Sequence, residues 1–310
     1  MGKFISRAKR TLMLPAFALV IFLSGCADLV VLDPQGPVAE SQAELITFSI
    51  IMMLGIVAVV FVLFTYMLVK FRYRPEKEGN DNYDPTHHGN NKLEVIWTVI
   101  PLIIVTVLSI PTVTTIFELE NPPEVSADTE PLVVHATTAN YKWFFSYPEE
   151  DIETVNYLHI PTDRAIEFKL SSADSMTAIW IPALGGQKYN MAGMENTLYL
   201  QADNEGEYAG RNANYNGSGF AGHTFEVIAQ DEDDFNAWVS EVQETAPELS
   251  EEDYIEMLDP SLAVNAEFSS THLQYVDHGT NDGRDYIIDH YQGELGEKLH
   301  LQGGREIWDE

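Results

Sequence analysis

Two long apolar segments without a charged side chain constrain this sequence more than any other feature. Residues 45–69 and 95–117 contain no Asp, Glu, Lys or Arg, and the second segment is interrupted only by Pro101 and Pro111. A helix that crosses a bilayer needs about 20 mainly apolar residues. Proline is tolerated in such a helix when neighbouring groups satisfy the freed carbonyls. We therefore expect membrane helices at residues 45–69 and 93–117. Buried helices of a soluble protein are the alternative that this length disfavours.

The N-terminus carries the features of a secretory signal. Residues 1–10 are basic, residues 12–23 are apolar, and the segment ends in Leu23-Ser24-Gly25-Cys26. This order is typical of a cleaved signal, and its ending looks like a lipobox, in which the cysteine becomes a lipidated N-terminus. We expect a lipoprotein signal over residues 1–25, with a plain signal peptide as the alternative. Because Cys26 is the only cysteine, its lipidation would leave no thiol for a disulfide or a metal site.

The distribution of basic residues predicts the orientation in the membrane. The loop of residues 70–92 contains five basic side chains, namely Lys70, Arg72, Arg74, Lys77 and Lys92. Short loops rich in Lys and Arg stay in the cytoplasm. The lead of residues 26–44 and everything after residue 117 would then lie on the extracytoplasmic face of the cell membrane. A lipid on Cys26 requires the same orientation.

The exterior part of the chain is strongly acidic. Residues 118–310 hold 39 acidic and 8 basic side chains, and this part accounts for the whole formal net charge of −31. Such a field excludes nucleic acid and anionic lipid headgroups as partners of that face. The acids are spread along the segment rather than clustered. We therefore favour a general adaptation to a high-salt habitat over a docking surface for a cationic protein.

Short β segments dominate residues 131–230. Ile166, Phe168 and Leu170 alternate with polar residues, and residues 197–202 show the same alternation. Such alternation is typical of half-buried strands. About 100 residues of strands and turns predict one sandwich or small barrel.

The composition changes after residue 230. Residues 231–260 contain 12 acidic and no basic side chains. Acids at 231–234 favour a helix N-terminus, and Phe235, Trp238 and Val242 follow at helical spacing. We expect an acidic helical extension over residues 231–278, in which Phe268, Leu273 and Tyr275 add a strand, and a peripheral tail over 279–310.

Several motifs resemble one family. Residues 93–101 (LEVIWTVIP) open the second apolar segment, and residues 141–145 (YKWFF) begin the β region. Residues 175–189 (SMTAIWIPALGGQKY) and 191–194 (MAGM) are more specific. Together they resemble subunit II of the haem–copper oxidases, in the quinol-oxidising branch and most of all the aa3-type quinol oxidases, from Cys26 to about residue 276. The resemblance implies a membrane-anchored α+β protein: a two-helix hairpin, an extracytoplasmic cupredoxin-like β-sandwich or barrel over 118–230, and short C-terminal helices.

In the cytochrome c branch of this family, the β domain carries a binuclear copper centre. That centre requires two thiolates, two imidazoles, a thioether and a backbone carbonyl, because soft sulfur ligands hold mixed-valence copper. The resemblance places the two thiolates at Tyr215 and Gly219, the acidic residue between them at Gly217, the imidazoles at Thr177 and His223, and the thioether at Glu226. Only His223 keeps its identity. We therefore expect no metal in this loop and a structural role for His223.

The resemblance also implies a function. The chain would be a subunit of a proton-pumping quinol:O2 oxidoreductase and would itself hold no redox cofactor, with the haems and one copper in subunit I. Membrane quinol would be reached through subunit I, and subunits III and IV would be further partners. The hairpin would clamp subunit I, and the β domain would cap it. Trp143 would serve packing and subunit contact.

One ionisable residue of the hairpin is a candidate for proton chemistry. Glu94 begins the second membrane helix on the cytoplasmic side, where relatives have a Glu at the mouth of a proton path. An ionisable group near the end of a membrane helix is a functional candidate. A capping or snorkelling carboxylate is the alternative, because acids favour helix N-termini.

Two other functions remain to be weighed. The missing thiols exclude a copper-bearing cytochrome c oxidase subunit II. A membrane-tethered lipoprotein that binds or scaffolds something unrelated is opposed only by the motif resemblance. The sequence does not identify the quinol, although residues 175–189 lean towards menaquinol-using relatives.

Overall fold

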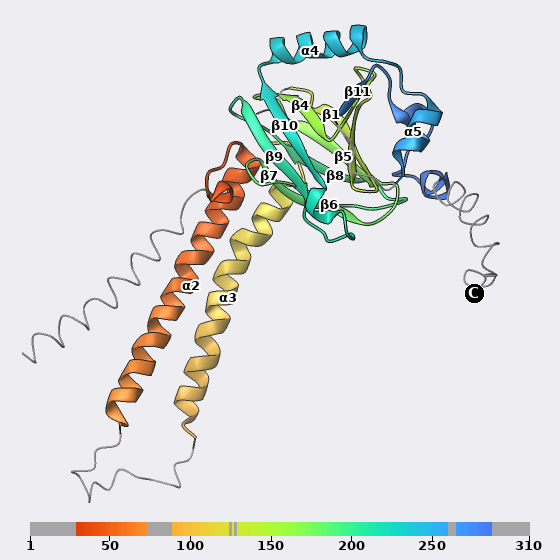
Figure 1. Ribbon diagram of the computed structural model, residues 1–310. Helices are drawn as coiled ribbons and strands as arrows, with labels where there is room; N and C mark the ends of the chain where they lie inside the picture. The colour runs from red at the N-terminus through yellow and green to blue at the C-terminus, as the bar shows by residue number, and fades with distance from the viewer. Residues whose placement is uncertain (1–28, 73–88, 124–125, 127–128, 260–264, 287–310) are drawn as a thin grey trace, which may run out of the picture.

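The computed structural model describes residues 29–72, 89–123, 126, 129–259 and 265–286. Two long helices extend from one end of a β domain, and a helix and a C-terminal segment cover other parts of that domain (Figure 1). The predicted signal, Cys26, Arg74, Lys77 and the tail beyond residue 286 lie outside the described residues.

The predicted hairpin is present as two helices long and apolar enough to cross a membrane. After a short 3₁₀ turn, η1 (Val30–Leu32), they are α2 (Pro37–Lys70) and α3 (Asn91–Glu118), with Pro101 and Pro111 inside α3. At 1.5 Å per residue, the 34 residues of α2 span about 51 Å. This exceeds the roughly 30 Å of a hydrocarbon core. The helix therefore begins well before the predicted span at residue 45.

The extra length of α2 packs on the β domain. Val38 and Ala39 are buried there. Two glycines allow this close approach: a Cβ at Gly36 would lie 1.9 Å from the Gln201 carbonyl oxygen, and one at Gly185 would lie 2.9 Å from Val38 Cγ1. Gly185 also has a φ of +105°, which favours glycine. The first turns of α2 are thus built into the domain rather than tethered to it.

The β domain is a sandwich of two mixed sheets. One sheet has the order β11-β3-β2-β1-β5-β8 and the other β4-β10-β9-β6-β7. The strands of the first are β11 (Ala266–Phe268), β3 (Ile152–Val155), β2 (Lys142–Tyr147), β1 (Leu132–Ala139), β5 (Ile166–Ser172) and β8 (Asn196–Leu200). Those of the second are β4 (Tyr157–Pro161), β10 (Thr224–Gln230), β9 (Gly206–Asn212), β6 (Thr177–Ile181) and β7 (Gly185–Asn190). Parallel pairs β1–β5 and β4–β10 accompany antiparallel neighbours, and the main apolar core fills the space between the sheets.

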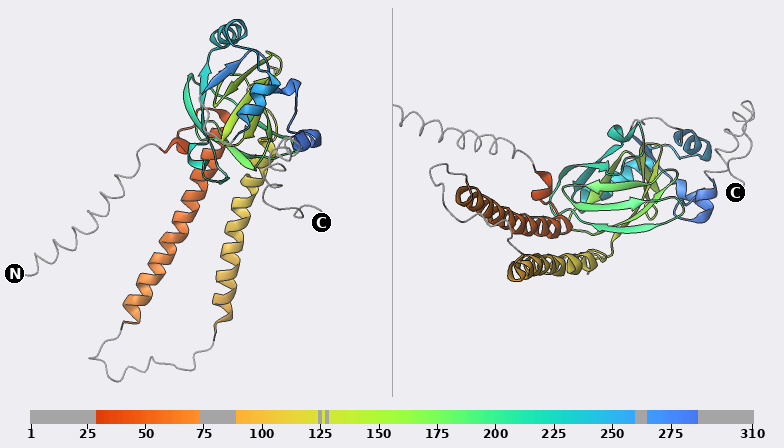
Figure 2. Two further views of the ribbon diagram at one scale, coloured as in Figure 1. Left: turned by 45° about the vertical axis from the view of Figure 1, so that its right-hand side comes forward. Right: turned by 90° about the horizontal axis from the view of Figure 1, so that it is seen from below.

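The acidic extension begins with a capped helix, as the sequence predicted. The side chain of Asp231 accepts a hydrogen bond from the Asp234 N–H at 2.8 Å and caps α4 (Glu232–Thr245). The helix buries Phe235 and Val242. It lies across the end of the sandwich opposite the membrane helices, as Figure 1 and the left view of Figure 2 show.

The rest of the extension covers the outer face of the first sheet. The helix α5 (Glu251–Met257) and the 3₁₀ turn η4 (His272–Gln274) lie on that face, while β11 pairs with β3 as the edge strand of the sheet itself. Tyr254, Leu258 and Val276 form a second core with Phe144 and Val155. Phe268 lies in a strand as expected, but Leu273 belongs to η4, and Tyr275 follows that turn. The beginning of the predicted tail also packs here, since Arg284 lies beside Gly193 and Tyr286 beside His278.

Candidate functional site

The loop after β9 is the place where the sequence resemblance puts the lost copper ligands. It runs from residue 213 to His223 through the 3₁₀ turn η3 (Phe220–Gly222), and its ends are fixed because Thr224 of β10 pairs with Arg211 of β9. The Asn212 N–H donates to the His223 carbonyl at 2.9 Å and closes the loop. In Figure 1 the loop lies at the end of the sandwich from which α2 and α3 extend.

His223 is fully buried and is held by side-chain amides. Asn212 Oδ1 accepts from the N–H groups of Ala178 and Asn214 at 3.0 and 2.9 Å. These two bonds fix the amide, so Asn212 Nδ2 faces His223 Nδ1 at 3.3 Å, and Asn216 Nδ2 lies 3.4 Å from the same atom. Because amide nitrogens only donate, Nδ1 accepts and the ring proton sits on Nε2.

Electrostatics agree with a neutral ring. Burial lowers the pKa of His223 to about 4, and the Lys142 carbonyl opposes that decrease. The ring packs against Trp143, with centroids 5.0 Å apart. A nitrogen lone pair that already accepts from amide donors is not available to a metal. The structure thus assigns His223 to packing and hydrogen bonding within the loop.

The ring of Tyr141 fills the space beside the two loop glycines. A Cβ at Gly219 would lie 2.5 Å from the Tyr141 ring, and one at Gly217 would lie 2.4 Å from its hydroxyl oxygen. Tyr141 reaches this place from the two-residue turn between β1 and β2, where Asn140 and Tyr141 have φ values of 44° and 71°. A cysteine at 219 would collide with this ring, so the loop does not fit a thiolate-bridged copper pair.

The other predicted positions are only partly brought together. Thr177 is buried, and its hydroxyl forms a hydrogen bond of 2.9 Å with the hydroxyl of Thr138. Tyr215 is 74% exposed and packs on Phe220, and Glu226 is exposed on β10. No group of three or more His, Cys, Asp or Glu residues that could hold a metal occurs among the described residues.

The residues that define this site were not singled out from the sequence. The sequence pattern gave no reason to select Asn212, and it marked Tyr141 only as part of an aromatic motif. The alternation of Asn212, Asn214 and Asn216 before a lone histidine is the signal that was present. It marks a loop in which side-chain amides form hydrogen bonds with the backbone and with the imidazole.

Glu94 lies in the first turn of α3 and is exposed. The helix is capped by Asn90, whose side chain accepts from the N–H groups of Lys92 and Leu93 at 3.0 and 3.4 Å. The carboxylate turns back over the helix start, since a Cβ at Gly89 would be 2.7 Å from Glu94 Oε1. This geometry agrees with a helix-terminal carboxylate and leaves the acid accessible.

Two membrane-spanning helices followed by a cupredoxin-like sandwich define the class of oxidase subunit II proteins. A family model described as "Cytochrome C oxidase subunit II, transmembrane domain" matches residues 26–115. Over 277 residues the chain is 58% identical to the quinol oxidase subunit 2 of Bacillus spizizenii, covering 89% of this chain and 86% of the relative. It is 49% identical over 271 residues to that of Bacillus cereus, covering 87% and 92%. The chain belongs to the quinol oxidase subunit 2 family.

The solved structures that resemble part of the chain share little sequence with it. The periplasmic domain of subunit II of cytochrome oxidase of Bradyrhizobium japonicum is 21% identical, with a TM-score of 0.34, covering 35% of this chain and 91% of that domain. Membership of the quinol oxidase subunit 2 family makes the protein a membrane subunit of a respiratory oxidoreductase, with a place in a complex with other oxidase subunits.

Proposed function

We propose that this chain is subunit II of a proton-pumping terminal oxidase that oxidises quinol with O2 to quinone and water, and that it carries no redox centre itself. The observation that supports this most directly is the loop after β9. Asn212 amide hydrogens occupy the imidazole lone pair, and the Tyr141 ring occupies the space of a thiolate. An electron relay from cytochrome c would need a metal at that place.

Electrons then reach the haems by another route. Quinol dissolved in the membrane delivers them at subunit I, which would hold the haems and one copper. A cytochrome c oxidase subunit II is disfavoured because Cys26 is the sole cysteine of the sequence. A signal over residues 1–25 and a lipid on Cys26 belong to the same proposal and would add a second anchor to the membrane.

The structural role is to clamp and cap subunit I. Large apolar side chains are exposed all along α2 and α3, as expected for helices that contact lipid and a partner within the bilayer. The loop after β9 adds exposed Tyr215 at the membrane-facing end. Exposed Met176, which precedes β6, lies beside this loop, since Asn214 Nδ2 donates to the Met176 carbonyl at 2.8 Å. We place subunit I against this end, with subunits III and IV as further members of the complex.

Glu94 is proposed as the cytoplasmic mouth of a proton path into subunit I. Its exposed position at the start of α3 supports the proposal. Glu94→Gln in the assembled oxidase is expected to lower quinol-dependent turnover several-fold without loss of haem. The matched control is Glu120→Gln at the outer end of the hairpin. Equal turnover in both variants would leave Glu94 as a capping residue.

Purification of the membrane complex through this chain tests the main proposal. We expect a haem spectrum, one copper per complex, and oxygen uptake with reduced quinol but not with reduced cytochrome c. Uptake with cytochrome c would contradict the metal-free loop. A preparation without haem would favour an unrelated lipoprotein scaffold.

A further inference from the structure

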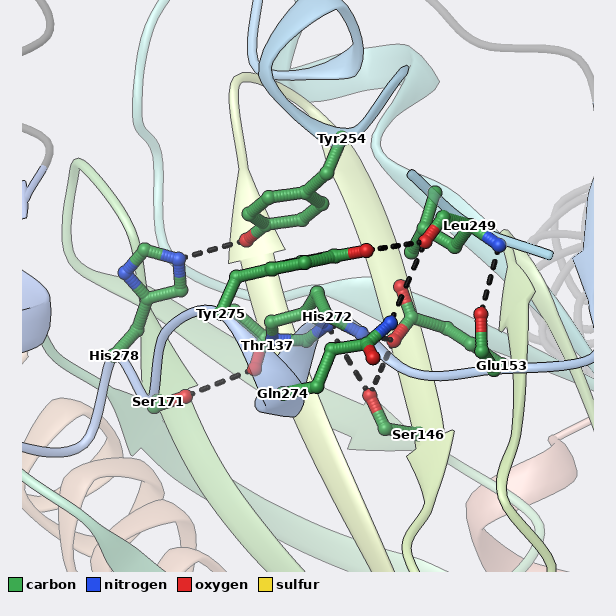
Figure 3. Close-up of polar contacts among 11 residues, drawn as sticks. Thr137, Ser146, Glu153, Ser171, Leu249, Tyr254, His272, Gln274, Tyr275 and His278 are labelled. Atoms are coloured by element: carbon green, nitrogen blue, oxygen red, sulfur yellow. Dashed lines mark hydrogen bonds and ion pairs between the residues drawn. The ribbon is translucent and has the colours of Figure 1, made fainter. Parts of the chain in front are cut away.

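The second core of the β domain contains a cluster of buried polar and ionisable groups. It lies between the outer face of the first sheet and residues 266–286, which we call the C-terminal strap. Ser146 and Glu153 come from β2 and β3, Tyr254 from α5, and His272 and His278 from the strap, all without exposed surface. Figure 3 shows these side chains facing one another across the interface.

One carboxylate oxygen connects the strap to the sheet. Glu153 Oε2 accepts from the Ser146 hydroxyl at 2.7 Å, from the His272 backbone N–H at 2.9 Å and from His272 Nδ1 at 2.7 Å. Among the described residues, Glu153 Oε1 and His272 Nε2 have no partner. The strap is therefore anchored to the sheet by two hydrogen bonds from His272 to one buried carboxylate oxygen of Glu153.

His278 is held in its uncharged form. Its Nδ1 lies 3.2 Å from the Gly283 carbonyl oxygen, which only accepts, so the proton is on Nδ1. Its Nε2 lies 2.7 Å from the Tyr254 hydroxyl and accepts from it. The Tyr254 ring in turn stacks on His272, with centroids 4.7 Å apart. A second proton on His278 would make Nε2 a donor and force the tyrosine hydroxyl to reverse.

We propose that the C-terminal strap is an acid-responsive latch, closed while His278 is uncharged and bonded to Tyr254 and Gly283, and released as the extracytoplasmic medium acidifies. Release would expose the outer face of β2 and β3, including Phe144. The proposal requires only that the domain faces that medium, so it can fail without affecting the oxidase assignment.

The charged and titratable groups around the cluster determine whether acidification opens or closes the strap. Burial lowers the pKa of His278 to about 3, the charge of His272 lowers it further, and the Gly283 carbonyl opposes both. Burial also lowers the pKa of His135 on β1, opposed first by Asp277 and Glu195. Further charged or titratable groups near the cluster, in the described part of the chain, include Lys169 of β5, Asp174, Glu251, Arg284 and Tyr286.

A histidine with a depressed pKa stabilises the closed strap above its ordinary pKa, and this contribution is lost as the pH falls. A released histidine titrates near 6.5. The opening constant is the equilibrium constant between the released and the closed strap. For one histidine with a closed-state pKa near 3, this constant is roughly thirtyfold larger at about pH 5 than at about pH 7.5. The response therefore falls between pH 6.5 and 3.

Amide hydrogen exchange of the full chain in detergent tests the latch. Exchange rates at about pH 7.5 and about pH 5 are divided by the intrinsic rates at each pH, and the resulting opening constants are compared. We expect the strap to open at least about tenfold more at the lower pH, while β1 and β5 change little. A strap whose opening constant follows that of the sandwich strands would overturn the proposal.

A matched pair of variants separates titration from packing. His278→Gln removes the titratable ring, so the ratio of the two opening constants should fall to a few-fold, even if the strap is looser at both pH values. His159→Gln is the control, because His159 stacks on Trp238, lies 3.0 Å from Gln230 Oε1 and is not a member of the buried cluster. Retention of the full pH ratio in His278→Gln would refute the assignment.

Discussion

The loop after β9 and the C-terminal strap both bury an imidazole completely, but they hold it in opposite ways. At the loop, amides of Asn212 and Asn216 face His223 and none of these groups is charged. At the strap, the carboxylate of Glu153 holds His272. Neutral donors preserve the shape of a loop at any pH above the titration of the ring. A buried charge makes the docked geometry depend on its partners, because removing one of them leaves another unpaired.

The largest effect is expected from removing that charge. Glu153→Ala would leave the donors of Ser146 and His272 without an acceptor in a buried place, and should lower the free energy of unfolding by about 3–5 kcal/mol. Urea unfolding of the full chain in detergent, followed by tryptophan fluorescence, measures this. Glu149→Ala, at an exposed acid nearby, should change stability by less than about 0.5 kcal/mol. Similar losses in the two variants would show that the carboxylate does not anchor the strap.

At the loop, the corresponding test converts an amide into a charge. Asn212→Asp keeps the acceptor for Ala178 and Asn214 but places a carboxylate opposite His223 Nδ1, so the pKa of His223 should rise from about 4 to above its ordinary value near 6.5. Nuclear magnetic resonance of ¹⁵N-labelled histidine reports this pKa. An unchanged pKa would mean that the Asn212 amide nitrogen does not face the ring.

The same variant has a stability signature. In the wild type the depressed pKa of His223 stabilises the fold above pH 6.5, and this contribution, at most about 3 kcal/mol, is lost as the pH falls towards 4. Asn212→Asp should remove that loss, because its histidine is charged in the folded state as well. Unfolding free energies measured across this pH range provide the comparison.

A steric test examines the packing of the loop after β9 without changing any charge. Gly219→Ala should destabilise the chain by about 1–3 kcal/mol, because the new methyl group meets the Tyr141 ring. Tyr141→Ala should cancel most of that cost in the double variant, as a double-mutant cycle measures. Gly217→Ala should stay costly in the Tyr141→Ala background, since φ at Gly217 is +126°. Additive costs for Gly219 and Tyr141 would contradict the contact.

The smallest effect concerns surface charge. If the acidity of the exterior is a salt adaptation, screening should slow amide exchange in α4 and α5, whose first turns are wholly acidic, and leave the amide-lined loop unchanged. We expect an effect below about 1 kcal/mol between low and high salt. Exchange of α4 that does not depend on salt would argue against this origin of the acidity.

Patterns with a clear period were sufficient to predict the scaffold. Uncharged runs predicted the hairpin, alternation predicted β5 and β8, and the acids at 231–234 predicted a capped helix at α4. The start of α2 at Pro37 was missed, because Val38 and Ala39 pack against the domain instead of lipid, and no local pattern reveals a tertiary contact.

The two buried clusters escaped prediction for a related reason. Glu153 and His272 are 119 residues apart in the chain, and each looks like an ordinary surface residue in its own segment. Tyr141 fills the space beside Gly219 only because a hairpin turn with positive φ aims it there. Sequence spacing locates ligands that share one loop, but it does not identify a side chain that enters from another hairpin.

The unbroken passage of α2 from the bilayer into the sandwich makes the exterior domain respond to the membrane itself. A helix accommodates a thinner or thicker hydrocarbon layer by tilting. The close contacts at Gly36, Val38 and Gly185 hold the first turns of α2 in the domain. When α2 tilts, the domain therefore tilts with it. Lipid composition would therefore set the height above the bilayer and the inclination at which the loop after β9 meets the subunit that we place against it.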